Sequence, residues 1–153
     1  MPNFIFDIQT GSIVSYPDPY RMIEITSDKK MKVSTNYVTS IDWDTQGLSV
    51  EEYSYNTFMK YMTIYTTNEL INEYGQDPTT AAQLAPMIAN AFTIHYKGDE
   101  VMPAEVEQVI EMMRQSGDTI QLFFAATLEA LLTDLDPMDN NITIDLETGG
   151  VTQ

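Results

Sequence analysis

The chain has 153 residues, in which 23 Asp and Glu face 7 Lys and Arg, so the formal net charge is −16. This charge argues against direct binding to nucleic-acid phosphates, which requires a basic face. The absence of Cys excludes disulfides, thiolate metal sites and cysteine nucleophiles. No apolar run approaches the ~18–20 residues that span a bilayer, and no signal-peptide pattern opens the sequence. We therefore expect no membrane association, and a location in the cytoplasm of a host cell or in a virion.

Residues 1–48 have the patterns of β-structure. Phe4, Phe6 and Ile8 alternate with other residues, as in a half-buried strand. Turn residues around Gly11 predict that this strand forms a hairpin. Further strands are predicted at residues 13–16, at residues 22–25 and 31–33 as a second hairpin, and at residues 35–43.

Residues 49–136 have the patterns of about four helices. Ser49 and Glu52 fit a capping box at the start of the first helix. Asp77 followed by Pro78 is typical of another helix start, and Pro86 should kink or split the helix that follows. Residues 93–96 predict a short strand. Later helices should begin near Pro103 and at Asp118, the last reaching about Leu135 and apolar almost all round.

Residues 141–147 predict a C-terminal strand, followed by a tail at residues 148–153. The tail leaves no room for a full return strand. We therefore expect residues 141–147 to pair with the N-terminal sheet or with another chain. The sequence as a whole predicts an α+β fold in a single domain, residues 1–153. Its hairpin-rich sheet, joined by the C-terminal strand, packs against about four helices.

The negative charge is uneven along the sequence. Residues 1–48 carry a formal charge of −2 and residues 49–153 carry −14. An acidic surface repels nucleic acid and attracts basic partners. Candidate members of an acidic partner-binding face are Glu105, Glu107, Glu111 and Asp118.

Aromatic residues suggest a second kind of interface. Tyr is enriched at protein interfaces, although core packing with an exposed hydroxyl group explains the same residues. The helix after Asp118 could likewise be a buried central element or an interface. The candidate apolar or aromatic interface consists of Tyr53, Tyr61, Tyr65, Phe123 and Leu131.

One cluster of oxygen ligands could suit a metal ion. Asp134, Asp136 and Asp139 lie within six residues of one another, and carboxylates suit Ca²⁺ or Mg²⁺. The alternative is a solvated loop, because the spacing matches no motif of defined geometry.

Three functions remain open from the sequence. The first is a non-enzymatic, acidic interaction or assembly protein without a cofactor, for which we interpret the composition as that of a viral (phage) structural or morphogenesis component. It would bind a protein partner with a basic face and could form a homo-oligomer. The second is a nucleic-acid mimic that inhibits a DNA-binding enzyme. The third is a small metal-dependent enzyme that uses the Asp134–Asp139 cluster.

Overall fold

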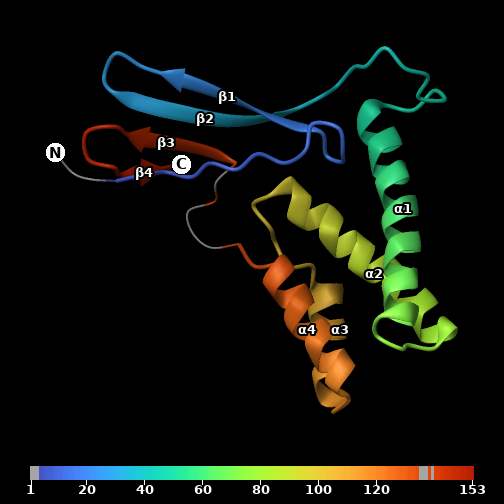
Figure 1. Ribbon diagram of the computed structural model, residues 1–153. Helices are drawn as coiled ribbons and strands as arrows, with labels where there is room; N and C mark the ends of the chain where they lie inside the picture. Colours follow the sequence, from blue (N-terminus) through green and yellow to red (C-terminus); the bar gives the residue numbers. More distant parts are fainter. Residues whose placement is uncertain (1–3, 135–137, 139) are drawn as a thin grey trace. The chain divides into compact units, whose positions relative to one another are not determined.

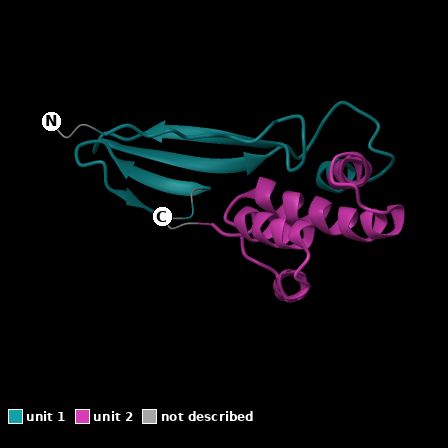
Figure 2. Cartoon of the chain, turned by 60° about the horizontal axis from the view of Figure 1, so that its bottom comes forward, with its two compact units in different colours: residues 1–54, 135–153 teal, residues 55–134 magenta. Residues whose placement is uncertain are grey.

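A computed structural model describes residues 4–134, 138 and 140–153. The described residues form a four-stranded antiparallel sheet and four helices, which confirms the predicted α+β class (Figure 1). The chain divides into two compact units (Figure 2). The sheet unit contains residues 1–54 and 135–153, and the helical unit contains residues 55–134. Among the described helices, none combines the length and the apolar composition needed to cross a membrane.

The sheet has the strand order β1-β2-β3-β4. Strands β1 (Pro19–Ile25) and β2 (Lys30–Tyr37) form the predicted second hairpin. Strand β3 (Asn141–Asp145) pairs antiparallel with β2, and β4 (Val151–Thr152) pairs with β3. The prediction that the C-terminal strand joins the N-terminal sheet is therefore confirmed within one chain, and the strand ends at Asp145.

The two faces of the sheet differ in polarity because side chains alternate along each strand. Val33 lies opposite Ile23 on β1 and opposite Ile142 on β3, while Met31 lies opposite Ile25 and Ile144. Val33, Ile142 and Ile144 form the buried cluster of this apolar face. The opposite face carries polar cross-strand pairs, including Glu24 with Lys32 and Lys30 with Asp145.

The predicted first hairpin is wrong. Residues 4–16 contain no strand, and Ile8 instead packs against the buried cluster of the apolar face. The alternation of apolar residues at positions 4–8 thus belongs to a segment whose Ile8 packs on the sheet, but whose main chain does not form the hydrogen-bond ladder of a strand. The strand predicted at residues 35–43 is also wrong beyond Tyr37. Strand β2 stops there because its partner β1 begins opposite it, at Pro19.

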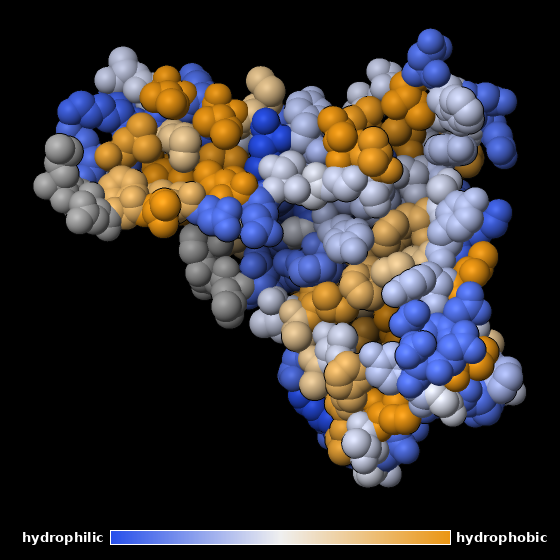
Figure 3. Space-filling model, in the orientation of Figure 1, coloured by the Kyte–Doolittle hydropathy of each residue, from blue (hydrophilic) through white to orange (hydrophobic). Residues whose placement is uncertain are grey.

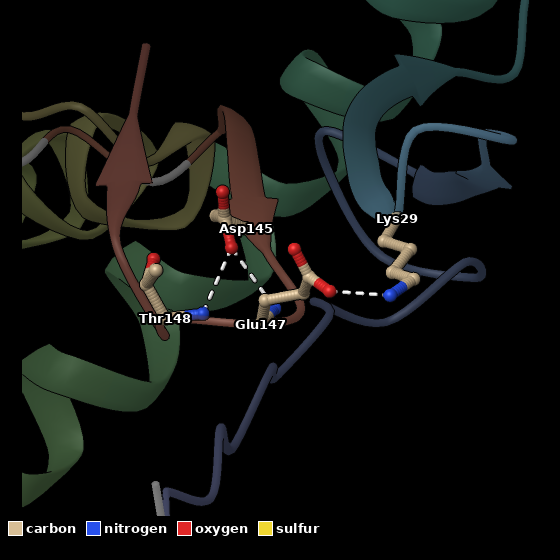
Figure 4. Close-up of polar contacts among 4 residues, drawn as sticks. All are labelled: Lys29, Asp145, Glu147 and Thr148. Carbon is tan, nitrogen blue, oxygen red and sulfur yellow. Dashed lines mark hydrogen bonds and ion pairs between the residues drawn. The ribbon is translucent and has the colours of Figure 1, made fainter. Parts of the chain in front are cut away.

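The β3–β4 turn is held by one carboxylate (Figure 4). Asp145 Oδ1 accepts hydrogen bonds from the backbone N–H groups of Thr148, at 2.8 Å, and Glu147, at 2.9 Å. The Glu147 side chain in turn forms an ion pair with Lys29, which lies between β1 and β2. The backbone N–H groups of Thr148 and Glu147 hold the pKa of Asp145 below its ordinary value of 3.8.

This lowered pKa predicts an acid-sensitive turn. A carboxyl group whose pKa is depressed by folding stabilises the fold above its unfolded pKa, and this contribution disappears as the pH falls through the folded pKa. At pH 7, the melting temperature of wild type should therefore be higher than that of Asp145→Asn. The difference should shrink as the pH falls below about 4. Melting curves in moderate salt check this, and a difference that stays constant with pH would contradict it.

Helix α1 (Val50–Asn72) begins with the predicted capping box. The Ser49 N–H donates to Glu52 Oε2 at 3.0 Å, and the Glu52 N–H donates to Ser49 Oγ at 3.2 Å. These hydrogen bonds satisfy two backbone donors that a helix start otherwise leaves unpaired. The hydroxyl and backbone N–H of Ser49 also lower the pKa of Glu52.

Helix α2 (Pro78–Lys97) starts at its predicted cap, where Asp77 accepts hydrogen bonds from the backbone N–H groups of Thr79 and Thr80. The helix continues through Pro86 and does not split there. The strand predicted at residues 93–96 is wrong, since these residues form the last turn of α2. Helical pairing within an Ala-rich segment outweighs their β-favouring composition.

Helices α3 (Ala104–Gln115) and α4 (Thr119–Leu131) complete the helical unit. Asp118 caps α4 as predicted, but the helix ends at Leu131 and does not reach Leu135. All four helices contribute to one buried core, formed by Leu70, Ala81, Ala85, Ile88, Ala91, Ile110, Met113, Phe124, Ala125, Leu128 and Leu132.

Candidate partner-binding surfaces

Helix α1 carries an exposed apolar face, which we call the α1 face and define as Tyr61, Ile64 and Tyr65. Residues three and four positions apart are neighbours on a helix, so these three side chains lie together. They are 63%, 51% and 59% exposed, respectively. Lys60 Nζ lies 5.5 Å from the centre of the Tyr61 ring. The α1 face thus contains two of the five candidate interface residues, Tyr61 and Tyr65, and also Ile64, which the sequence analysis missed although its spacing from Tyr61 could have indicated it.

The other predicted interface residues do not join the α1 face. Tyr53 is half-buried, and its hydroxyl oxygen accepts a hydrogen bond from Trp43 Nε1 at 3.3 Å. Phe123 is exposed but stacks on Tyr74, with ring centres 5.7 Å apart. Leu131 is partly buried against the helical core. These three side chains therefore already have packing partners within their own units.

The predicted acidic residues are exposed but do not form one row. Glu107 and Glu111 lie one turn apart on α3, whereas Glu105 is two positions from Glu107 and therefore points to another side of the helix. Asp118 is engaged in capping, because its Oδ1 accepts the backbone N–H groups of Ile120 and Gln121. Nucleic-acid mimicry requires aligned acids, so this alternative stays a prediction from charge.

The negative charge is uneven along the sequence, but it is divided equally between the two compact units. The sheet unit contains 4 basic and 12 acidic residues, and the helical unit contains 3 basic and 11 acidic residues. Each unit therefore has a formal charge of −8. Within the sheet unit, residues 19–37 of the β1–β2 hairpin carry four basic and two acidic side chains, a net charge of +2. This hairpin is a locally basic element in an acidic protein.

The predicted metal ligands can be followed only in part. Asp134 is half-buried, while Asp136 and Asp139 lie outside the described residues. Oδ2 of Asp134 is buried and has no hydrogen-bond partner. Within the described part of the chain, no three His, Asp or Glu side chains form a group that could hold a metal ion. The metal-dependent alternative stays a prediction.

Strand β1 is an edge of the sheet, which the sequence analysis did not indicate. The Thr26 N–H donates to Lys30 O, and the Val38 N–H donates to Asp18 O. Hydrogen-bonded pairs recur every two residues in an antiparallel ladder, so even-numbered β1 residues bond to β2. The N–H and C=O groups of Arg21, Ile23 and Ile25 consequently point away from the sheet.

The apolar side chains of β1 are also exposed. Ile23 and Ile25 are 57% and 70% exposed, although their neighbours on β2 belong to or pack against the buried cluster. Figure 3, which has the orientation of Figure 1, shows apolar side chains at the surface in the region of the sheet strands. The β1 edge, defined as residues 21–25, therefore combines outward main-chain groups with exposed apolar side chains.

The chain matches no family model, no curated protein and no solved structure.

Proposed function

We propose that this protein is a non-catalytic subunit that binds another protein through the α1 face. The observation that carries the proposal is the group of three largely exposed apolar side chains, Tyr61, Ile64 and Tyr65, at neighbouring helix positions. Tyr offers a large contact area at low cost in conformational entropy and is enriched at interface centres. A helix that inserts a few neighbouring apolar side chains into a groove is a recurrent mode of protein recognition.

The charge of the helical unit suggests the chemistry of the partner. A unit of formal charge −8 attracts a surface of opposite sign and repels nucleic acid. We therefore propose a partner that presents an apolar groove surrounded by basic residues. The basic residues would speed and orient the encounter, while the buried tyrosine rings would supply most of the affinity.

The double substitution Tyr61→Ala and Tyr65→Ala tests this proposal. Both side chains are exposed, so the fold should remain intact, as circular dichroism can verify. Wild-type protein is immobilised on a resin and incubated with a lysate of the organism that encodes it. It should retain a defined protein through a high-salt wash, because apolar contacts are not screened by salt. The double variant should lose at least about tenfold of this binding.

The matched control is Asn56→Ala, an exposed substitution elsewhere on α1, which should bind like wild type. Equal retention by the double variant would reject the α1 face as the binding site. Recovery of a DNA-processing enzyme that is lost at high salt would instead favour the mimicry alternative.

A further inference from the structure

We infer that the loop before helix α1 binds an arginine-bearing segment of another protein, with the arginine side chain stacked on the indole ring of Trp43. We call residues 41–48 the Trp43 loop, which belongs to the connection between β2 and α1 (Figure 1). The inference goes beyond the proposed function, because the Trp43 loop belongs to the sheet unit, whereas the α1 face belongs to the helical unit.

The Trp43 loop presents apolar groups to solvent. Trp43 is the only Trp in the chain and is 69% exposed, and the large side chains of Ile41 and Leu48 are exposed as well. The indole N–H, which is the one polar group of the Trp43 side chain, already donates a hydrogen bond to the Tyr53 hydroxyl oxygen. The ring therefore offers a ligand its aromatic surface and not a hydrogen-bond donor.

Hydrogen bonds on both sides of the ring hold the Trp43 loop in place. Beside the bond from Trp43 to Tyr53, Asp44 Oδ1 accepts the Gln46 backbone N–H at 2.8 Å. Thr45 Oγ1 donates to the Leu48 backbone oxygen at 2.7 Å. A group that is already held in one place loses less conformational entropy when a ligand binds to it. Exposed Trp side chains that are fixed in this way are suited to supply much of the affinity of an interface.

Charge selects one ligand among those that an exposed indole ring can stack on. Single-stranded nucleic acid also stacks on aromatic side chains, but it needs a basic groove for its phosphates. An anionic membrane surface would be repelled by acidic residues for the same reason. A cation, in contrast, is attracted both by carboxylates and by the face of the indole ring. Residues 33–59 contain no basic residue and four acidic ones, Asp42, Asp44, Glu51 and Glu52.

Arginine fits the Trp43 loop better than lysine does. The guanidinium group is planar and weakly hydrated, so it stacks on an aromatic ring and can pair with a carboxylate at the same time. Asp42 and Asp44 directly precede and follow Trp43, and both are exposed. Glu52 is engaged in the capping box with Ser49. The charge of the bound arginine is therefore met by Asp42 and Asp44.

The single Trp allows binding to be observed at the ring itself. The probe is a short peptide in which Arg alternates with Gly, added to the full chain in moderate salt. The nuclear magnetic resonance signal of the Trp43 indole N–H should shift and saturate as the peptide is added. A peptide with Lys in place of each Arg carries the same charge but should bind at least about threefold more weakly, because ammonium groups stack poorly.

Substitutions separate the Trp43 loop from the general attraction of an acidic chain for a basic peptide. Trp43→Leu keeps an apolar side chain but removes the aromatic ring, so calorimetry should show at least about threefold weaker binding of the Arg peptide. Asp42→Asn should weaken binding by about twofold or more. The matched control is Glu107→Gln, which removes the same charge from an exposed position on α3 and should bind like wild type.

Three results would overturn the inference. They are equal binding by wild type and Trp43→Leu, equal binding of the Arg and Lys peptides, and equal effects of Asp42→Asn and Glu107→Gln. Tighter binding of a peptide with Leu in place of Arg, or of single-stranded DNA, would also reject arginine as the ligand. The double substitution Tyr61→Ala and Tyr65→Ala should leave binding of the Arg peptide unchanged. Failure of this inference can therefore be distinguished from failure of the α1 face as a binding site.

Discussion

Replacing Ile144 with Asp should unfold the sheet unit. Ile144 is 0% exposed and packs with Val33 and Ile142 in the buried cluster, so the new carboxylate would have neither water nor a basic partner beside it. An unpaired buried charge costs roughly 3–5 kcal/mol, which is comparable with the whole stability of a small sheet. In urea titrations, the backbone amide protons of β2 and β3 should lose their protection from exchange at a much lower concentration than in wild type.

The adjacent residue provides a sharp control. Thr143 lies on the opposite face of β3, directly across from Lys32, so Thr143→Asp places the same carboxylate beside a positive charge. We expect its effect on stability to stay within about 0.5 kcal/mol. The pair of variants tests the strand register, because a slip of one residue would exchange the two faces. If Thr143→Asp were the damaging variant, the β2–β3 register described above would be wrong.

Helix starts were the part of the fold that the sequence predicted best. Ser49 with Glu52, and Asp77 with Pro78, act through hydrogen bonds over two or three residues, so the information lies entirely in the local sequence. The β1–β2 hairpin was predicted for the same reason, since its turn connects neighbouring strands. Local chemistry is sufficient where both partners of an interaction lie within one turn.

Strand extent depends on distant partners, and there the prediction failed. Residues 4–8 have the alternation of a strand, but alternation reports which side chains face apolar surroundings and not whether the main chain finds a partner. Ile8 does face the sheet cluster, without a ladder. Strand β2 similarly ends at Tyr37 because β1 begins at Pro19, a limit that lies 18 residues away in sequence.

The candidate surfaces were predicted only in part, for a related reason. The spacing of Tyr61 and Tyr65 places them on one side of a helix, but their exposure depends on how the other helices pack. Ile23 and Ile25 fit any half-buried strand, and nothing local distinguishes an edge strand from a central one. The uneven charge along the sequence did not indicate the charge of each unit, because residues 49–54 and 135–153 belong to the sheet unit.

Leu128→Ala in helix α4 should be the most damaging truncation in the helical unit. Leu128 is almost fully buried and belongs to the core to which all four helices contribute. Removing its side chain loses transfer free energy and leaves a cavity, at a cost of about 2–5 kcal/mol. Leu122→Ala on the same helix is the control. Its side chain is 42% exposed, so it should lose much less. Equal losses would contradict the orientation of α4.

The same variant tests the predicted single domain. The buried clusters of the sheet unit and the helical unit share no residue. If residues 1–153 nevertheless fold as one cooperative domain, Leu128→Ala should lower the denaturation midpoints of the helices and of the sheet together. Circular dichroism follows the helices, and amide exchange at Val33 and Ile142 follows the sheet. A helical transition that moves to lower urea while the sheet transition stays in place would show two independently folding units and reject the single-domain prediction.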